Sequence, residues 1–368
     1  MSSLADLVEE ADRQFTICNA CRYCQDYCAV FPAMERRRDF DVADFAQLAT
    51  LCHDCRSCQQ ACMYTDPHEF AINIPLLMSE GRTATYAETA RPRILIRALA
   101  RGPAGVAALS AALLAVILLG FLVTSSLDRV FTGHGGGSGS LYAAVPHLAM
   151  IIPGIVLGLI AVGAVGIGVR SFWKMPDRVP ESSGGTKAWG GALREAATLR
   201  WMKGGGGECY FPEEERASPA RRRLHHLVAY GFVLTFLATI AAFFYENGLG
   251  KLPPYPLLSV PVLLGLIGGI GLVVGCLGLL WEKRRMTPGL AAPKAVKQDN
   301  TLLFTLLLVS ITGLLLLLWR SSSAMGTLVV IHLATVFALF LTAPYGKFVH
   351  VVYRTAALLR DQKEREAA

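Results

Sequence analysis

The feature that most restricts how this chain can fold is a series of apolar runs too long for the core of an ordinary soluble domain. The runs GVAALSAALLAVILLGFLV (105–123) and TLLFTLLLVSITGLLLLLW (301–319) each contain 19 residues without a charge. An α-helix needs roughly 20 apolar residues to cross a bilayer. Such runs begin only after Arg101, and the sequence before it is mixed and charged. The sequence therefore predicts an integral membrane protein with a polar N-terminal head.

Six spanning helices are expected, and the basic residues between them indicate their orientation. The expected spans lie near residues 104–124, 143–169, 225–245, 257–281, 301–319 and 325–345. An even number of spans puts both termini on one side of the membrane, and an excess of Lys and Arg marks the cytoplasmic side. One set of connections carries three basic residues in total, at 125–142, 246–256 and 320–324. The other set carries 21, at 170–224, 282–300 and 346–368, so this set and both termini are expected in the cytoplasm.

We therefore expect a membrane all-α fold with two parts. Residues 1–92 form a cytoplasmic head, and residues 93–368 form a six-helix transmembrane bundle with a cytoplasmic loop at 170–224 and a cytoplasmic C-terminal tail. The start of the chain lacks a basic stretch followed by an apolar one, so no cleaved signal peptide is expected. The expected location is the cell inner membrane. The net charge of +7 is then a topology signal, and nucleic acid is not an expected partner.

The head contains eight cysteines in two runs, CNACRYCQDYC (18–28) and CHDCRSCQQAC (52–62). Both runs read C-x2-C-x2-C-x3-C, the spacing with which bacterial ferredoxins ligate two [4Fe–4S] clusters. In that pattern three close cysteines hold one cluster, and the fourth turns to the other cluster. The expected ligand sets are Cys18, Cys21, Cys24 and Cys62 for one cluster, and Cys52, Cys55, Cys58 and Cys28 for the other.

Three observations bear on this interpretation of the cysteines. Thiols in the cytoplasm are kept reduced, so regular clusters there favour metal over disulfides. Zinc sites are the alternative, but they usually take two separated pairs of ligands and do not need the third close cysteine. The proline that commonly follows the fourth cysteine is absent from both runs. The head is thus expected to be a small bacterial-type 2[4Fe–4S] ferredoxin-like domain, with His53 and His68 as solvated side chains or neighbours of the ligands.

Histidines in or near the expected spans suggest a second kind of redox site. An ionisable residue in a spanning helix is costly, so it is first considered as a functional residue. His332 and His350 are 18 residues apart. On one continuous helix this spacing is five whole turns and would place both imidazoles on one face, about 27 Å apart. His225 and His226 begin the third span on the inner side, and His147 begins the second span on the outer side.

Two packed helices that each supply a histidine can hold a b-type haem. We expect an inner haem on His350 with His225 or His226, and an outer haem on His332 with His147. The alternative is that these side chains are interfacial: His225 and His226 follow three arginines, and His147 follows a proline at a helix start. One or two haems are therefore expected.

Three segments in this order resemble the tricarballylate utilization protein B family, also called the CitB-domain family. They are CHDCRSCQQACMYTDPHEFAINIP, GGGGECYFPEEERASPARRRLHHLVAYGF and HLATVFALFLTAPYGKFVHVVYR. The last segment also resembles the haem-binding end of the gamma subunit of respiratory nitrate reductase. That subunit draws two histidines from one further helix, whereas Thr235 and Phe236 stand at the corresponding positions here. The outer haem is the one affected, and His147 is its substitute ligand.

The resemblance implies a membrane electron-transfer protein. Members of the family are taken to reoxidise an FAD-dependent tricarballylate dehydrogenase, so a flavoprotein, quinone and the lipid bilayer are the implied partners. The chain itself offers no nucleophile, acid–base pair or dinucleotide fold, so the substrate chemistry belongs to the flavoprotein and only a quinone reductase step is left to this chain. Alternatives are a redox-sensing membrane protein or transporter without haem, and a subunit of a cobalamin-pathway oxygenase with flavin, haem and iron–sulfur centres.

Overall fold

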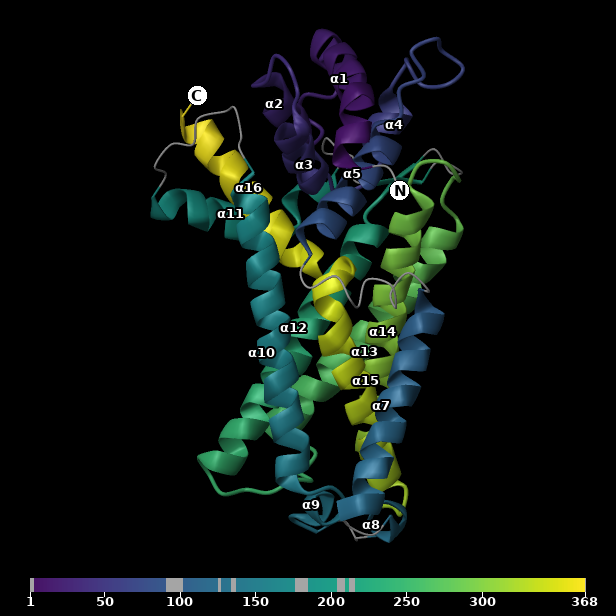
Figure 1. Cartoon of the computed structure of the whole chain (residues 1–368), viewed down its shortest axis with the longest axis vertical. Coiled ribbons are helices and arrows are strands. Elements are labelled where there is room, and N and C mark those ends of the chain that lie inside the picture. The colour runs from purple at the N-terminus through teal and green to yellow at the C-terminus, as the bar shows by residue number, and fades with distance from the viewer. Residues whose placement is uncertain are drawn as a thin grey trace.

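The computed structural model describes residues 3–90, 102–124, 127–133, 137–175, 185–203, 209–211 and 216–367. Within these ranges the protein is helical apart from one short antiparallel hairpin of β1 (Cys209–Phe211) and β2 (Arg216–Ser218). Figure 1 shows a bundle of long helices with a head of shorter helices at one end. The boundary that we expected between residues 92 and 93 lies outside the described residues.

Six helices are long and apolar enough to cross a membrane, as predicted. They are α7 (Pro103–Thr124), α10 (His147–Trp173), α12 (Ala220–Asn247), α13 (Val260–Arg284), α14 (Pro293–Leu318) and α15 (Met325–Thr342). The short helices α8 (Asp128–Phe131) and α9 (Ser140–Ala144) lie at the end of the bundle opposite the head (Figure 1). Glycines let α12 and α13 approach closely, since a Cβ on Gly231 would lie 2.9 Å from the carbonyl oxygen of Gly268. The fold is thus that of a multi-pass membrane protein.

The expectation that His332 and His350 share one continuous helix is wrong. Helix α15 ends at Thr342, two 3-10 turns follow at η2 (Ala343–Tyr345) and η3 (Lys347–Val349), and α16 (His350–Ala367) begins afresh. Pro344 lacks the N–H that an α-helix needs and its ring clashes with the preceding turn. Gly346 then adopts an extended conformation. The five-turn register therefore does not apply, and α16 runs obliquely toward the head (Figure 1).

The head consists of five short helices around one apolar core. They are α1 (Leu4–Cys21), α2 (Val30–Glu35), α3 (Val42–Leu51), α4 (Ser57–Ala61) and α5 (Ile74–Thr89). Capping boxes at Ser3 and Asp41 begin α1 and α3, because each side chain accepts backbone N–H groups that the first turn leaves unpaired. The same core includes Phe172 of α10 and Tyr353 of α16. The head and the membrane bundle therefore share one continuous core.

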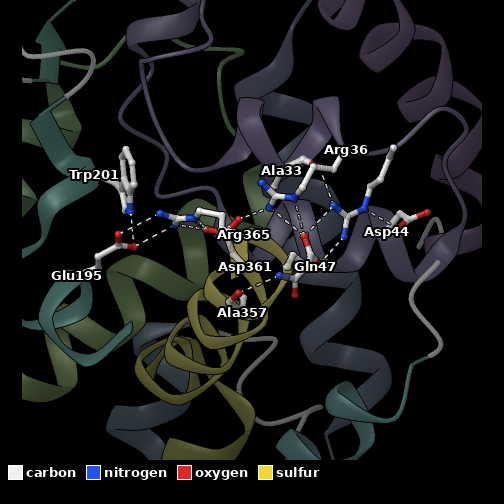
Figure 2. Close-up of polar contacts among 11 residues, drawn as sticks. Ala33, Arg36, Asp44, Gln47, Glu195, Trp201, Ala357, Asp361 and Arg365 are labelled. Carbon is white, nitrogen blue, oxygen red and sulfur yellow. Dashed lines mark hydrogen bonds and ion pairs between the residues drawn. The ribbon is translucent and has the colours of Figure 1, made fainter. Parts of the chain in front are cut away.

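Buried ion pairs fasten α16 to the head (Figure 2). Arg36 donates to Asp361 at 2.5 Å and to Glu364 at 2.9 Å. Arg37 is 1% exposed and donates to Asp44 at 2.6 Å and to Glu364 at 2.8 Å. Two guanidinium groups that directly follow α2 thus meet carboxylates from α16, more than 320 residues away in the sequence.

Further contacts extend this network on both sides. Gln47 of α3 donates to the carbonyl oxygen of Ala357 at 2.9 Å. On the other side Arg365 pairs with Glu195 of α11 (Thr186–Thr198) at 3.4 Å, and Glu195 also accepts a hydrogen bond from Trp201. The expected C-terminal tail is therefore a helix that connects the head, α11 and the end of the bundle.

Replacing Glu364 by Gln should destabilise this junction. The change removes a charge that faces the buried Arg37, and breaking a buried pair by removing one partner costs about 3 kcal/mol. The measurement is a denaturant titration in detergent, followed by the fluorescence of Trp173 and Trp201, which contact α16. The control is Glu366→Gln, which changes an exposed carboxylate on the same helix. Equal free energies of unfolding for the two variants would show that the network does not hold the head.

Candidate metal centres and the head–membrane junction

Four of the predicted ligands line one pocket of the head: Cys18, Cys21, Cys24 and Cys62. Cys18 and Cys21 lie in the last turn of α1, and Arg22 follows in the left-handed conformation, which turns the chain back. Cys62 comes from the end of α4. Burial, followed by the neighbouring thiols, raises the pKa of the Cys18 thiol to about 12. We call this group the first pocket.

The other four predicted ligands line a second pocket: Cys28, Cys52, Cys55 and Cys58. Asp54 and Arg56 both have positive φ, at 56° and 66°, so the chain curls tightly between the three close cysteines. Burial raises the pKa of Cys28 and of Cys58 well above the ordinary range, with neighbouring thiols as the next cause. Each fourth cysteine therefore lies with the first three of the other run.

The donor atoms of both pockets suit an iron–sulfur cluster. Four thiols surround each pocket, and the first pocket has no carboxylate among its lining residues. Such all-cysteine sets hold [4Fe–4S] clusters. A bound metal reverses the effect of burial on a thiol, because its positive charge stabilises the thiolate. Across the described ranges, no three His, Cys, Asp or Glu side chains are arranged to hold a single metal ion.

A group of basic side chains, which we call the basic layer, acts on both the second pocket and His350. Arg82 of α5 is buried, and Arg354 lies on α16. Both interact electrostatically with Cys52 on one side and with His350 on the other. Nη1 of Arg354 is buried without a hydrogen-bond partner among the described residues. The second pocket and the predicted inner haem ligand therefore share the same two arginines as electrostatic neighbours.

His53 belongs to this layer and is not solvated. Its side chain is only 8% exposed. Burial lowers its pKa well below the ordinary range, and the charges of Arg354, Arg221 and Arg82 lower it further. His68, in contrast, accepts a hydrogen bond from the backbone of Phe70 in a turn. Of the two expected alternatives, His53 is therefore a neighbour of the ligands.

His350 and His225 are electrostatic neighbours in the structure. His350 is the first residue of α16, and its Nδ1 lies 3.4 Å from the hydroxyl oxygen of Tyr86 in the head. Burial lowers the pKa of His350 well below its ordinary value, followed by the charges of Lys347, Arg354 and Arg82 and by His225. Nδ1 of His225 is buried without a partner in the described part of the chain. His226 instead stacks on Tyr230, with ring centroids 5.7 Å apart.

The two outer histidines contact different helices. Nδ1 of His332 lies 3.0 Å from the hydroxyl oxygen of Thr312 on α14. Gly313 makes this approach possible, because a Cβ there would lie 3.0 Å from the imidazole. Nε2 of His147 lies 2.8 Å from a carboxylate oxygen of Glu246 at the end of α12. The structure thus provides a protein partner for each outer imidazole.

Some of the functional candidates carry no signal in the sequence. Tyr86 lies 264 residues before His350, and nothing in its surroundings marks it as a partner of that histidine. In the sequence, Glu246 is recognisable only as an acidic residue at the end of an expected span. A carboxylate next to an expected connection could have suggested a partner for His147, whose helix starts on the same side.

These observations define a class: a multi-pass membrane protein with a ferredoxin-like iron–sulfur head. Residues 97–368 match the family model described as Citrate utilization protein B, and residues 11–88 match the one described as Citrate utilization protein B Fer4-like domain. The chain is 42% identical over 362 residues to "Citrate utilization protein B" of Escherichia coli, an alignment that covers 95% of this chain and 91% of that protein.

The chain therefore belongs to the citrate utilization protein B family, as the resemblance predicted. Its Fer4-like domain indicates iron–sulfur binding and an electron-transfer role. No solved structure matches the chain.

Burial should govern how fast the thiols react in the metal-free protein. The thiolate is the reactive form, so Cys28 and Cys58, whose pKa values burial raises, should alkylate at least about tenfold more slowly at pH 8 than the exposed Cys21. Raising the pH should speed the two slow thiols, since more thiolate forms as the pH approaches a raised pKa. Iodoacetamide labelling with peptide mass spectrometry measures these rates. Equal rates at all three positions would contradict the pocket geometry.

Proposed function

We propose that this protein is a membrane electron relay. It accepts electrons from an FAD-dependent dehydrogenase, passes them through two [4Fe–4S] clusters and a b-type haem, and delivers them to quinone in the bilayer. The observation that carries the proposal is the shared basic layer. Arg82 and Arg354 act on Cys52 of the second pocket and also on His350. A cluster held there and a haem held by His350 would share these two arginines as neighbours.

In this proposal Cys18, Cys21, Cys24 and Cys62 hold one cluster, and Cys28, Cys52, Cys55 and Cys58 hold the other. Iron–sulfur clusters supply one-electron transfer when bound. The first pocket is the entry, because exposed apolar side chains border it: Tyr23 is 61% exposed and Met63 is 66% exposed. Such a patch is suited to contact with a protein partner. The flavoprotein would dock there.

The inner haem is proposed on His350 and His225. The contact with Tyr86 would fix the ring of His350 and leave its Nε2 for iron, in the way that second partners orient ligating histidines. Nδ1 of His225 and Nη1 of Arg354 are buried without a hydrogen-bond partner among the described residues. These two atoms suit a cofactor that binds an imidazole as a ligand and also carries carboxylates. Lys347 adds a further positive charge beside His350.

A second haem on His332 and His147 stays a prediction without comparable support, because Thr312 and Glu246 already contact these rings. The relay requires only the inner haem. The relative from Escherichia coli is named for citrate utilization. We accordingly propose a flavoprotein that oxidises a tricarboxylate such as tricarballylate as the electron donor. The excess of basic residues in the connections near the head supports an inner-membrane location with both termini in the cytoplasm.

Cofactor content tests the relay directly. Protein purified anaerobically with its membrane part intact should contain roughly eight non-haem irons per chain if both clusters form. Its reduced-minus-oxidised spectrum should show a b-type haem. Adding the reduced flavoprotein should bleach the clusters and then reduce the haem, and quinone should reoxidise both. A colourless preparation without a paramagnetic signal after reduction would end the proposal.

The two adjacent histidines provide a matched pair for the haem. His225→Ala should abolish the haem spectrum, because His225 is the neighbour of His350. His226→Ala should retain it, because that ring stacks on Tyr230. Haem per chain is measured in both variants beside the iron content, which should not change. Loss of haem in His226→Ala with retention in His225→Ala would reverse the assignment.

A further inference from the structure

A large open pocket lies apart from the thiols and the inner histidines, at the end of the bundle that carries the head. It is formed by α11, the 3-10 turn η1 (Arg200–Lys203) and parts of α12 and α16, and its volume is about 580 Å³. Three arginines line it: Arg194, Arg200 and Arg222. Nothing in the proposed electron path uses this pocket.

The pocket carries an excess of positive charge. The only carboxylate among its lining residues is Glu195, which is 4% exposed. That carboxylate accepts a hydrogen bond from Trp201 at 2.7 Å and pairs with Arg365 at 3.4 Å. The guanidinium of Arg200 lies 4.8 Å from the centre of the Trp201 ring, and its side chain is 61% exposed. Arg200 itself also pairs with Glu195 at 3.4 Å, so three guanidinium groups line a pocket that contains one carboxylate.

Contacts with a spanning helix place this pocket at the level of the membrane boundary. The hydroxyl of Tyr230 on α12 donates to the carbonyl oxygen of Ala197 at 2.9 Å. Arg222, two residues after the start of α12, donates to the carbonyl oxygen of Thr198 at 3.0 Å. The C-terminal end of α11 is therefore fixed to the first turns of a membrane span, where the lipid headgroups lie.

Exposed apolar side chains lie on the same two helices, α11 and α12. Trp189 is 53% exposed and Leu193 is 54% exposed, and residues four apart lie on one face of a helix. Leu227 and Tyr230 on α12 are 40% and 50% exposed. Tryptophan and tyrosine are enriched at membrane interfaces, where their rings lie at headgroup level. An amphipathic helix with such residues lies in the plane of the interface.

We propose that this pocket binds the phosphate of an anionic phospholipid, with its acyl chains against the exposed apolar side chains of α12. Guanidinium groups bind phosphate through paired hydrogen bonds. Basic pockets between helices on the cytoplasmic side of membranes bind acidic lipid headgroups. The bound lipid would brace α11, and α11 contacts α16 through Glu195 and Arg365. Anionic lipid would thereby support the attachment of the head.

The test compares phosphatidylglycerol with phosphatidylcholine, titrated onto the intact protein in neutral detergent and counted by native mass spectrometry. The wild-type protein should bind phosphatidylglycerol more tightly. Arg194→Gln/Arg200→Gln should weaken this binding about thirtyfold, given roughly 1 kcal/mol for each basic residue near a lipid surface. The control Arg223→Gln/Arg284→Gln removes the same charge from exposed positions outside the pocket and should leave binding unchanged.

Three outcomes would overturn the proposal. Equal binding of the two lipids by the wild-type protein would do so without reference to any variant. Inorganic phosphate that displaces phosphatidylglycerol and matches its affinity would indicate a site for free anions. A double variant that keeps its lipid binding but loses reduction by the flavoprotein would assign this surface to the protein partner. The binding measurement needs neither clusters nor haem, so its result is independent of the proposed relay.

Discussion

The attachment of α16 to the head is the interaction on which the rest of this structure depends. Arg36 and Arg37 meet Asp361 and Glu364 in a buried network, and α16 begins at His350 where the chain leaves the bundle. A buried ion pair adds little net stability compared with apolar side chains in its place, but removing one partner of the ion pair is costly. The network therefore serves mainly to select one arrangement. It holds the cysteine pockets and the inner histidines as parts of a single rigid unit.

The membrane fold and the grouping of the thiols followed from local sequence patterns, because those signals repeat along the chain. Long apolar runs predicted the six spans, and the spacing of the cysteines predicted which four line each pocket. The continuous helix from His332 to His350 was the wrong inference. The spacing of 18 residues suited a helix, but Pro344 within it already carried the contrary signal. The spacing of two residues predicts that they share a helix face only where the backbone between them stays helical.

The junction between head and bundle could not be predicted, because the contacts that join α16 to the head connect residues far apart in the sequence. Tyr86 and His350 are 264 residues apart, and Arg37 and Glu364 are 327 apart. The charged residues of 346–368 predict only a cytoplasmic tail. Burial of Asp361 and Glu364 appears only when the arginines that follow α2 are placed beside them. No single-sequence pattern distinguishes such a helix from an exposed one.

The distribution of charge around the two pockets favours one direction of electron flow in the proposed relay. No Lys or Arg is among the described residues that line the first pocket, whereas the second is lined by Arg56 and by Asp54, which pairs with it at 3.4 Å. Arg82 and Arg354 also act on Cys52 of the second pocket. Nearby positive charge stabilises the more negative, reduced state of a centre, and local charge is one of the factors that set cluster potentials. A cluster in the second pocket would therefore be the easier of the two to reduce, which draws electrons from the exposed side of the head toward the membrane.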